Sequence, residues 1–172
     1  MATDIEAGTE RELLEGHLDG MRANAVRKLV GLSWVDATRR LGPSATSAAG
    51  ILKHLTEVER WWFRHNFAGE SDVPMWSTAE NPDGEFAIAQ DEDMDSLIAG
   101  YELACQQSRD IAARHSLDDQ CARPGRSGHR PSLRWLYIHL IEEIARHNGH
   151  LDIYRELLDG STGRWLDASR MP

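Results

Sequence analysis

Hydrophobic residues recur along this chain at steps of three and four, the spacing of an α-helix that buries one face. The first such stretch begins after residues 9–12 (TERE), where Thr9 and Glu12 can satisfy each other's free backbone amides in a capping box. The pattern predicts a first helix with one apolar stripe. The positions of this stripe are Leu14, Leu18, Met21, Ala25 and Leu29.

Three further stretches show the same period. One spans about residues 47–67, one begins near Asp93, and one spans about residues 132–160 and ends at Gly160, a residue suited to a left-handed C-cap. A short helix is also expected after Ser33. No stretch shows the alternating pattern of a strand. Four amphipathic helices joined by turn-rich connections predict an all-α fold, a four-helix bundle.

Polar residues interrupt the apolar face of the last helix. At 100° per residue, Glu143 and His147 fall in the same sector as Leu136, Leu140 and Leu151. Burying a carboxylate and an imidazole without partners costs several kcal/mol. The sequence therefore predicts that some interaction compensates for these two side chains.

The second helix carries a similar interruption. His54 belongs to the stripe of Ile51, Leu55, Val58 and Trp61 rather than to the polar face. A histidine opposite the Glu-x-x-x-His pair of the last helix supplies three nitrogen and oxygen ligands, the composition of an open zinc-type site. Spacing alone leaves two alternatives open. The inward histidines could be satisfied within the core, or the Glu and His could form a buried ion pair without a metal.

Composition narrows the classes of function. The chain has 172 residues, 41% hydrophobic and 27% charged, with a formal net charge of −9. These values indicate one globular domain over residues 1–172, with its bundle core at about residues 9–160 and a short C-terminal tail. An acidic field repels phosphate backbones, so we expect no nucleic-acid partner. One basic cluster is interpreted as a solvated loop and helix start: Arg123, Arg126, His129, Arg130 and Arg134.

The chain carries no sign of a membrane segment. No stretch approaches the roughly 20 apolar residues of a spanning helix, and the acidic N-terminus lacks the features of a secretory signal. A cytoplasmic protein with no membrane partner is therefore expected. Cys105 and Cys121 have no metal-type spacing and are interpreted as reduced thiols, with Cys105 a small core residue.

Aromatic residues gather at the end of the second helix and in the loop after it, namely Trp61, Trp62, Phe63 and Trp76. They could wall a substrate pocket over the metal site, but core packing and loop anchoring are the preferred interpretation for most of them. His139, one turn before the Glu of the last helix, is expected to orient a ligand or to cover the edge of the core.

Residues 52–63 (LKHLTEVERWWF) and 139–150 (HLIEEIARHNGH) together resemble the DinB superfamily, most closely an actinobacterial domain family of unknown function. The resemblance covers nearly the whole chain, up to Gly160. It implies a four-helix bundle that binds zinc or nickel through three side chains, one on the second helix and two a turn apart near the fourth. Many members carry His-x-x-x-His-Arg-Gly-Gln-Leu, where this chain has residues 143–151 (EIARHNGHL).

With the shared Gly and Leu in register, the resemblance implies that the metal ligands are His54, Glu143 and His147. A Glu in that place also occurs in the related mycothiol-dependent maleylpyruvate isomerase. This departure from the commoner pattern favours zinc, with nickel as the second candidate. His150 stands where other members carry Gln and is a candidate fourth ligand, or a donor to one of the three.

The resemblance implies a metal-dependent enzyme that uses a low-molecular-weight thiol such as mycothiol, as an S-transferase or an isomerase. The open position of the metal would take the thiol sulfur or water. Two alternatives remain: a metal-dependent hydrolase, and a non-catalytic protein that binds a metal or a small molecule. A small-molecule substrate and a homodimer are expected. The sequence assigns no catalytic side chain beyond the ligands.

Overall fold

The computed structural model describes residues 6–125 and 128–162, and within them every regular element is a helix. The only β-type pairing in these residues is an isolated bridge between Gln120 and Ser132. The predicted all-α fold is confirmed. Most of the expected C-terminal tail and Arg126 of the basic cluster lie outside the described residues. The elements are α1 (Glu10–Arg27), α2 (Trp34–Ala37), α3 (Ala48–Glu59), η1 (Arg60–Phe67), η2 (Gly84–Phe86), α4 (Met94–Ala112) and α5 (Leu133–Asp159).

The helix ends follow from local chemistry. Thr9 and Glu12 form the expected capping box at the start of α1. The side chains of Ser47 and Ser132 accept backbone amides at the starts of α3 and α5. Gly160 ends α5 with φ of 75°, a left-handed conformation that glycine adopts without strain. None of the described helices has the length and apolar character needed to cross a membrane.

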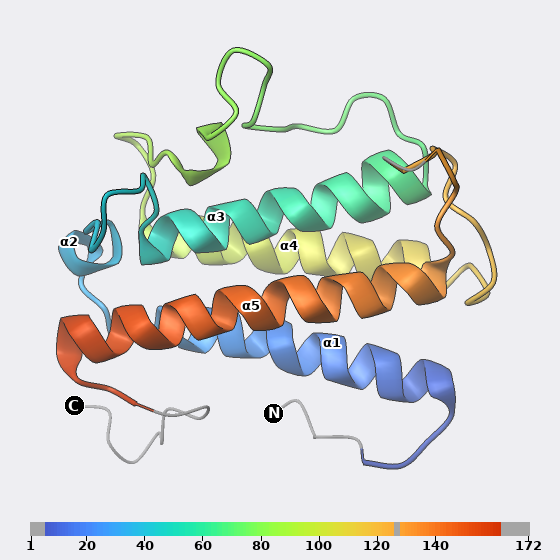
Figure 1. Ribbon diagram of the computed structural model, residues 1–172, viewed down its shortest axis with the longest axis horizontal. Coiled ribbons are helices and arrows are strands. Elements are labelled where there is room, and N and C mark those ends of the chain that lie inside the picture. The colour runs from blue at the N-terminus through green and yellow to red at the C-terminus, as the bar shows by residue number, and fades with distance from the viewer. Residues whose placement is uncertain (1–5, 126–127, 163–172) are drawn as a thin grey trace.

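Four long helices lie side by side and enclose the core (Figure 1). Helix α1 packs along α5, α4 packs along α3 and η1, and α3 also contacts α5. Leucine and isoleucine side chains from these helices fill the centre, together with the fully buried ring of Tyr101. The buried aliphatic residues include Leu18, Leu29, Ile51, Leu52, Leu55, Leu136, Leu140 and Ile144.

Polar contacts fix the position of α5 along α1. Arg155 of α5 is buried and donates to the carbonyl oxygens of Lys28 and Val30, at 3.0 and 2.7 Å. The amide of Asn148 donates to the carbonyl oxygen of Met21 at 3.0 Å. Arg155 satisfies the carbonyls of the C-cap residue of α1 and of the turn that follows it. Both side chains also hold one face of α5 against α1, so that its neighbouring face is turned toward α3.

The second predicted helix has the expected extent, but its last eight residues form the π-helix η1. A π-helix has more residues per turn than an α-helix, so positions beyond Glu59 do not continue the 100° pattern of α3. Phe63 and Phe67 are buried, whereas Trp61 is 44% exposed. The assignment of Trp61 to the buried stripe is therefore wrong, because that assignment assumed a continuous α-helix.

A buried ion pair lies at the junction of α3 and η1. Glu59 is fully buried and accepts two hydrogen bonds from Arg22 of α1, at 2.8 and 2.7 Å. Arg22 is 4% exposed, and its guanidinium lies 5.9 Å from the centre of the Phe63 ring. The pair ties α1 to the point where the α-helix changes to a π-helix.

Removing one partner of this pair should destabilise the fold strongly, because the other charge would stay buried without compensation. We expect Glu59→Ala or Arg22→Ala to lower the free energy of unfolding by about 3–5 kcal/mol. The double variant Arg22→Met, Glu59→Leu should lose far less. Urea unfolding followed by circular dichroism measures both. Single variants that remain within about 1 kcal/mol of the parent protein, a cost typical of exposed ion pairs, would contradict this prediction.

Candidate metal centre

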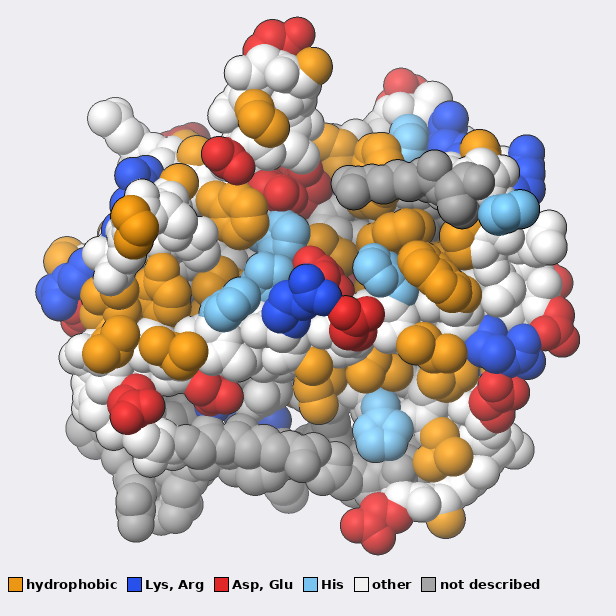
Figure 2. All heavy atoms as spheres, viewed as in Figure 1, with side chains coloured by type: hydrophobic (Ala, Val, Ile, Leu, Met, Phe, Trp, Pro, Cys, Tyr) orange, Lys and Arg blue, Asp and Glu red, His pale blue; other side chains and the backbone are white. Residues whose placement is uncertain are grey.

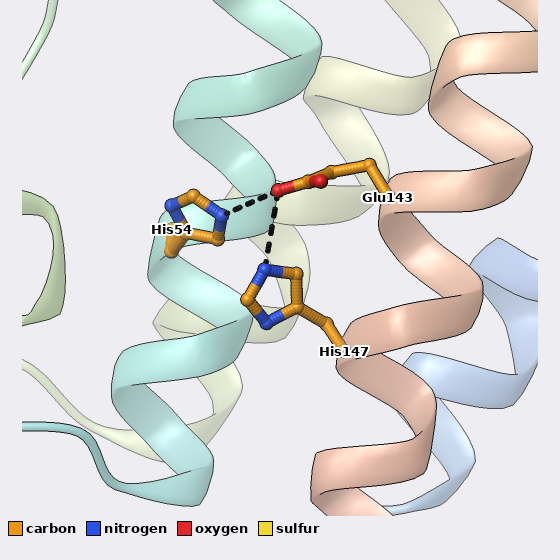
Figure 3. A group of neighbouring side chains, drawn as sticks. All are labelled: His54, Glu143 and His147. Atoms are coloured by element: carbon orange, nitrogen blue, oxygen red, sulfur yellow. Dashed lines mark hydrogen bonds and ion pairs between the residues drawn. The ribbon is translucent and has the colours of Figure 1, made fainter.

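Histidine side chains gather in the middle of the face seen in Figure 2, beside acidic and hydrophobic side chains. Three of the predicted residues come together from two neighbouring helices. His54 projects from α3, while Glu143 and His147 project from α5, one turn apart, and all three point toward one another (Figure 3). Nε2 of His54 lies 3.4 Å from Oε1 of Glu143, and Nε2 of His147 lies 3.2 Å from the same oxygen. One ligand atom from each residue lies within 4.8 Å of the others.

The three side chains are mostly buried but remain partly exposed to solvent. His54, His147 and Glu143 keep 12%, 13% and 20% of their side-chain surface exposed. The fully buried positions of α5 nearest to Glu143 are Leu140 and Ile144, so Glu143 and His147 lie on the flank of the core face rather than at its centre. The flank faces α3 and leaves one side of the cluster open to solvent.

The donor atoms suit a divalent cation. An unprotonated imidazole Nε2 and a carboxylate oxygen both present lone pairs, and such atoms repel one another unless a proton or a cation lies between them. Two imidazole nitrogens and one carboxylate oxygen are also the ligand types of catalytic zinc sites with three protein ligands. The arrangement of His54, Glu143 and His147 therefore fits a metal ion.

The surroundings of His147 and Glu143 shift the pKa values of both groups toward the forms that bind a metal. Burial and the nearby charge of His54 lower the pKa of His147, which favours the neutral imidazole. Burial opposes ionisation of Glu143, but His147 and His54 outweigh it and lower the pKa of this carboxyl. For His54 burial favours the neutral form, yet Glu85 and Glu143 outweigh it and raise the pKa. Binding of a metal would therefore displace a proton mainly from His54.

Two residues next to His54 were missed by the sequence analysis, and both belong to η2. Oε2 of Glu85 lies 2.9 Å from Nδ1 of His54. Its direction of approach falls short of a well-formed hydrogen bond, so the contact is best described as an ion pair. The ring of Phe86 stacks on the imidazole with centres 4.8 Å apart and planes 15° apart. Together Glu85 and Phe86 hold the His54 ring with Nε2 directed at Glu143.

Glycines allow the loop that carries η2 to approach α3. A Cβ on Gly50 of α3 would lie 2.8 Å from the carbonyl oxygen of Phe86, closer than side chains tolerate. A Cβ on Gly84 would overlap the carbonyl oxygen of Trp76. Buried Glu57 of α3 also accepts the backbone amides of Trp76 and Ser77. No local pattern in the loop signals this docking, because the contacts join segments far apart in the sequence.

The family model for mycothiol-S-transferases matches residues 13–160, which include His54, Glu143 and His147. The chain belongs to this family. The family is DinB-like, so the resemblance to the DinB superfamily is confirmed. A search among curated proteins gives no significant match.

Two further candidates in this mycothiol-S-transferase family member, His150 and Cys105, lie outside the group of three residues. His150 is exposed on α5, and its ring meets the His147 ring edge-on with centres 5.4 Å apart. This places His150 beside the group rather than within it. Cys105 is buried in α4, and burial raises the pKa of its thiol, which keeps it protonated. Both cysteines are free, as expected.

A cleft of about 930 Å³ opens beside the metal centre, and Glu143 belongs to its lining. Its walls include Trp61 and Trp62 of η1 and Trp135 and His139 of α5. The preference for packing and loop anchoring does not hold for exposed Trp61, which lines this cleft, whereas Trp62 both lines the cleft and packs against the core. The preference holds for buried Phe63, and for Trp76, whose ring lies under the cationic groups of Lys53 and Arg60.

Metal affinity should depend on the Glu85 carboxylate. Glu85→Gln removes the charge that holds Nδ1 of His54, and we expect a loss of about tenfold in zinc affinity, within the 10–100-fold range of such partners. Competition with a chromogenic chelator measures the affinity. Glu80→Gln, a change at an exposed carboxylate in the same loop, is the matched control. Equal zinc affinities for the two variants would exclude a role for Glu85.

Zinc affinity should also rise with pH. Because His54 binds metal only as the neutral imidazole and its pKa is raised above the ordinary value of about 6.5, a proton must leave below that pKa. The affinity should increase by up to roughly tenfold per pH unit below the raised pKa and level off above it. Calorimetry in two buffers of different ionisation enthalpy would count the protons released. No proton release at pH 6 would be inconsistent with the assignment of His54.

Proposed function

We propose that this protein is a metal-dependent mycothiol S-transferase. One observation carries the proposal: in a member of the mycothiol-S-transferase family, two imidazole nitrogens and a carboxylate oxygen converge, and Glu143 also lines a large cleft. A convergent ligand group next to a cleft is the arrangement expected of a catalytic metal, which must keep a position open for substrate.

Zinc is the proposed metal, with nickel as the second candidate. The ligand set of two His and one Glu matches that of known catalytic zinc sites and holds a single negative charge. When bound, such an ion lowers the pKa of a coordinated thiol and favours the thiolate near neutral pH. His54 and His147 would supply nitrogen ligands in their neutral forms, and Glu143 would supply the compensating charge.

The transfer itself needs no oxidant or reductant. The thiol sulfur of mycothiol would form a bond to an electrophilic carbon while the bond from that carbon to its leaving group breaks. The leaving group departs with the electron pair, and the thiol proton passes to solvent through the open side of the cluster. The aromatic walls of the cleft would shield the reacting atoms from water, which limits hydrolysis of the electrophile.

The proposal predicts that mycothiol transfer depends on the ligands. With zinc bound, the protein should accelerate the reaction of mycothiol with a chloroacetamide, and His147→Ala should reduce kcat/KM by at least about 100-fold, since loss of the metal removes thiolate activation. His17→Ala changes an exposed histidine of α1 and serves as the control. Metal content and circular dichroism of each variant are measured alongside.

Spectroscopy separates this function from its rivals. In the cobalt-substituted protein, mycothiol should produce a sulfur-to-metal charge-transfer band. If no thiol perturbs the spectrum but ester or amide hydrolysis is metal-dependent, the protein is a hydrolase. If neither occurs and metal is bound with His150 as a fourth ligand, the site is not catalytic.

A further inference from the structure

The cleft beside the metal centre has an aromatic wall. The rings of Trp62 and Trp135 lie with centres 5.3 Å apart, and His139 contacts both of them. Its imidazole stacks on Trp135 at 4.7 Å with planes 15° apart, and meets Trp62 edge-on at 4.8 Å. Trp62, Trp135 and His139, here called the aromatic cluster, therefore form one continuous surface between η1 and α5.

Part of this aromatic surface is exposed to solvent, although its burial would be energetically favourable. Trp135 is 43% exposed, although it lies in a concave cleft rather than on a convex face. Trp61, on the same wall, is 44% exposed and is held by its stacking on His65 at 4.5 Å. Large rings that are fixed by neighbours and face a cleft are typical of small-molecule sites rather than of core packing.

Most of the residues that line the cleft are apolar, with Val58, Pro124 and Pro131 beside the tryptophans. The Asn66 amide already donates to the carbonyl oxygen of Trp61 at 2.9 Å. The His139 ring stacks on Trp135 and meets Trp62 edge-on, and Glu143 belongs to the ligand group. A polyhydroxylated ligand would find few partners for its hydroxyl groups on these apolar side chains, at a cost in affinity. A planar apolar group would instead stack on the indoles and lose only its contact with water.

Part of the aromatic cluster lies on the same face of α5 as the metal centre. Trp135, His139 and Glu143 lie at four-residue steps on α5, so they occupy one face at intervals of roughly 6 Å along the axis. A molecule that stacks on the cluster can therefore direct an atom at its other end toward Glu143. The electrophilic carbon in the proposed transfer needs this position, next to the thiol sulfur.

We propose that the aromatic cluster is the subsite for a planar, apolar group of the electrophilic substrate, and that Trp135 sets the preference for such substrates. This inference rests on the proposed transferase function and names the substrate class of the same site. It predicts that two electrophiles with the same reacting carbon and leaving group differ in rate according to whether they carry a planar ring system.

The test compares chloroacetamide with 2-chloro-N-(1-naphthyl)acetamide in the zinc-bound protein with mycothiol. In both, the carbon–sulfur bond forms, the carbon–chlorine bond breaks, chloride leaves and a proton goes to the buffer. The ratio of kcat/KM values should favour the naphthyl compound, and Trp135→Ala should reduce this ratio by about tenfold, a typical contribution of one stacking ring. Trp135→Phe should restore most of it. Ile138→Ala, a change at a 55% exposed side chain of α5, should leave the ratio unaltered.

Binding of an unreactive analogue distinguishes this inference from the transferase proposal. N-(1-naphthyl)acetamide has no leaving group, so its quenching of tryptophan fluorescence reports binding alone, and Trp135→Ala should weaken it about tenfold. If it binds in this way but neither chloroacetamide reacts, the subsite stands and the transferase proposal fails. If both electrophiles react with an equal kcat/KM and the analogue does not bind, the subsite is wrong. If glucose quenches the fluorescence and the analogue does not, the cleft binds polyhydroxylated groups and the inference is overturned.

Discussion

Two imidazole nitrogens and a carboxylate oxygen meet in the seam between α3 and α5, and their lone pairs repel one another unless a proton or a cation lies between them. This constraint links the geometry of the bundle to its chemistry. The helices α3 and α5 have to lie close enough for the three side chains to reach one another, yet leave one side of the site open. Burial lowers the pKa of His147, and the neighbouring histidines keep Glu143 ionised. The site is thus prepared for a cation by the same packing that forms it.

Contacts remote from the three ligand residues fix the relative position of α3 and α5. Arg155 and Asn148 hold α5 against α1 through carbonyl oxygens of α1. The buried Arg22–Glu59 pair holds α1 against the end of α3. Because α1 contacts both α3 and α5, it fixes their relative position. The ligand residues themselves need not hold the two helices together.

The π-helix η1 gives the site its second component. A continuous α-helix would direct Trp61 toward the core, but the wider turn of η1 buries Phe63 and Phe67 and leaves Trp61 and Trp62 on the cleft wall. π-helical turns are frequent at functional sites because they turn side chains away from the positions that packing alone would select. In this protein the turn creates an aromatic wall whose surface is continued by Trp135 and His139 of α5, beside the metal centre.

The sequence by itself determined the helices and the identity of the three converging residues. Capping residues and apolar periodicity act within a few residues, so the start of α1 and both ends of α5 could be predicted locally. Glu143 and His147 share a face through helix geometry alone. Only the tertiary structure decided which residues support them. Glu85 and Phe86 reach His54 because Gly50 and Gly84 permit a loop to approach α3, and Trp61 faces the cleft because a π-turn replaces an α-turn. The loop's approach joins segments that are distant in the sequence, and the π-turn buries Phe63 and Phe67 in a core built by the other helices, so neither is visible in a local pattern.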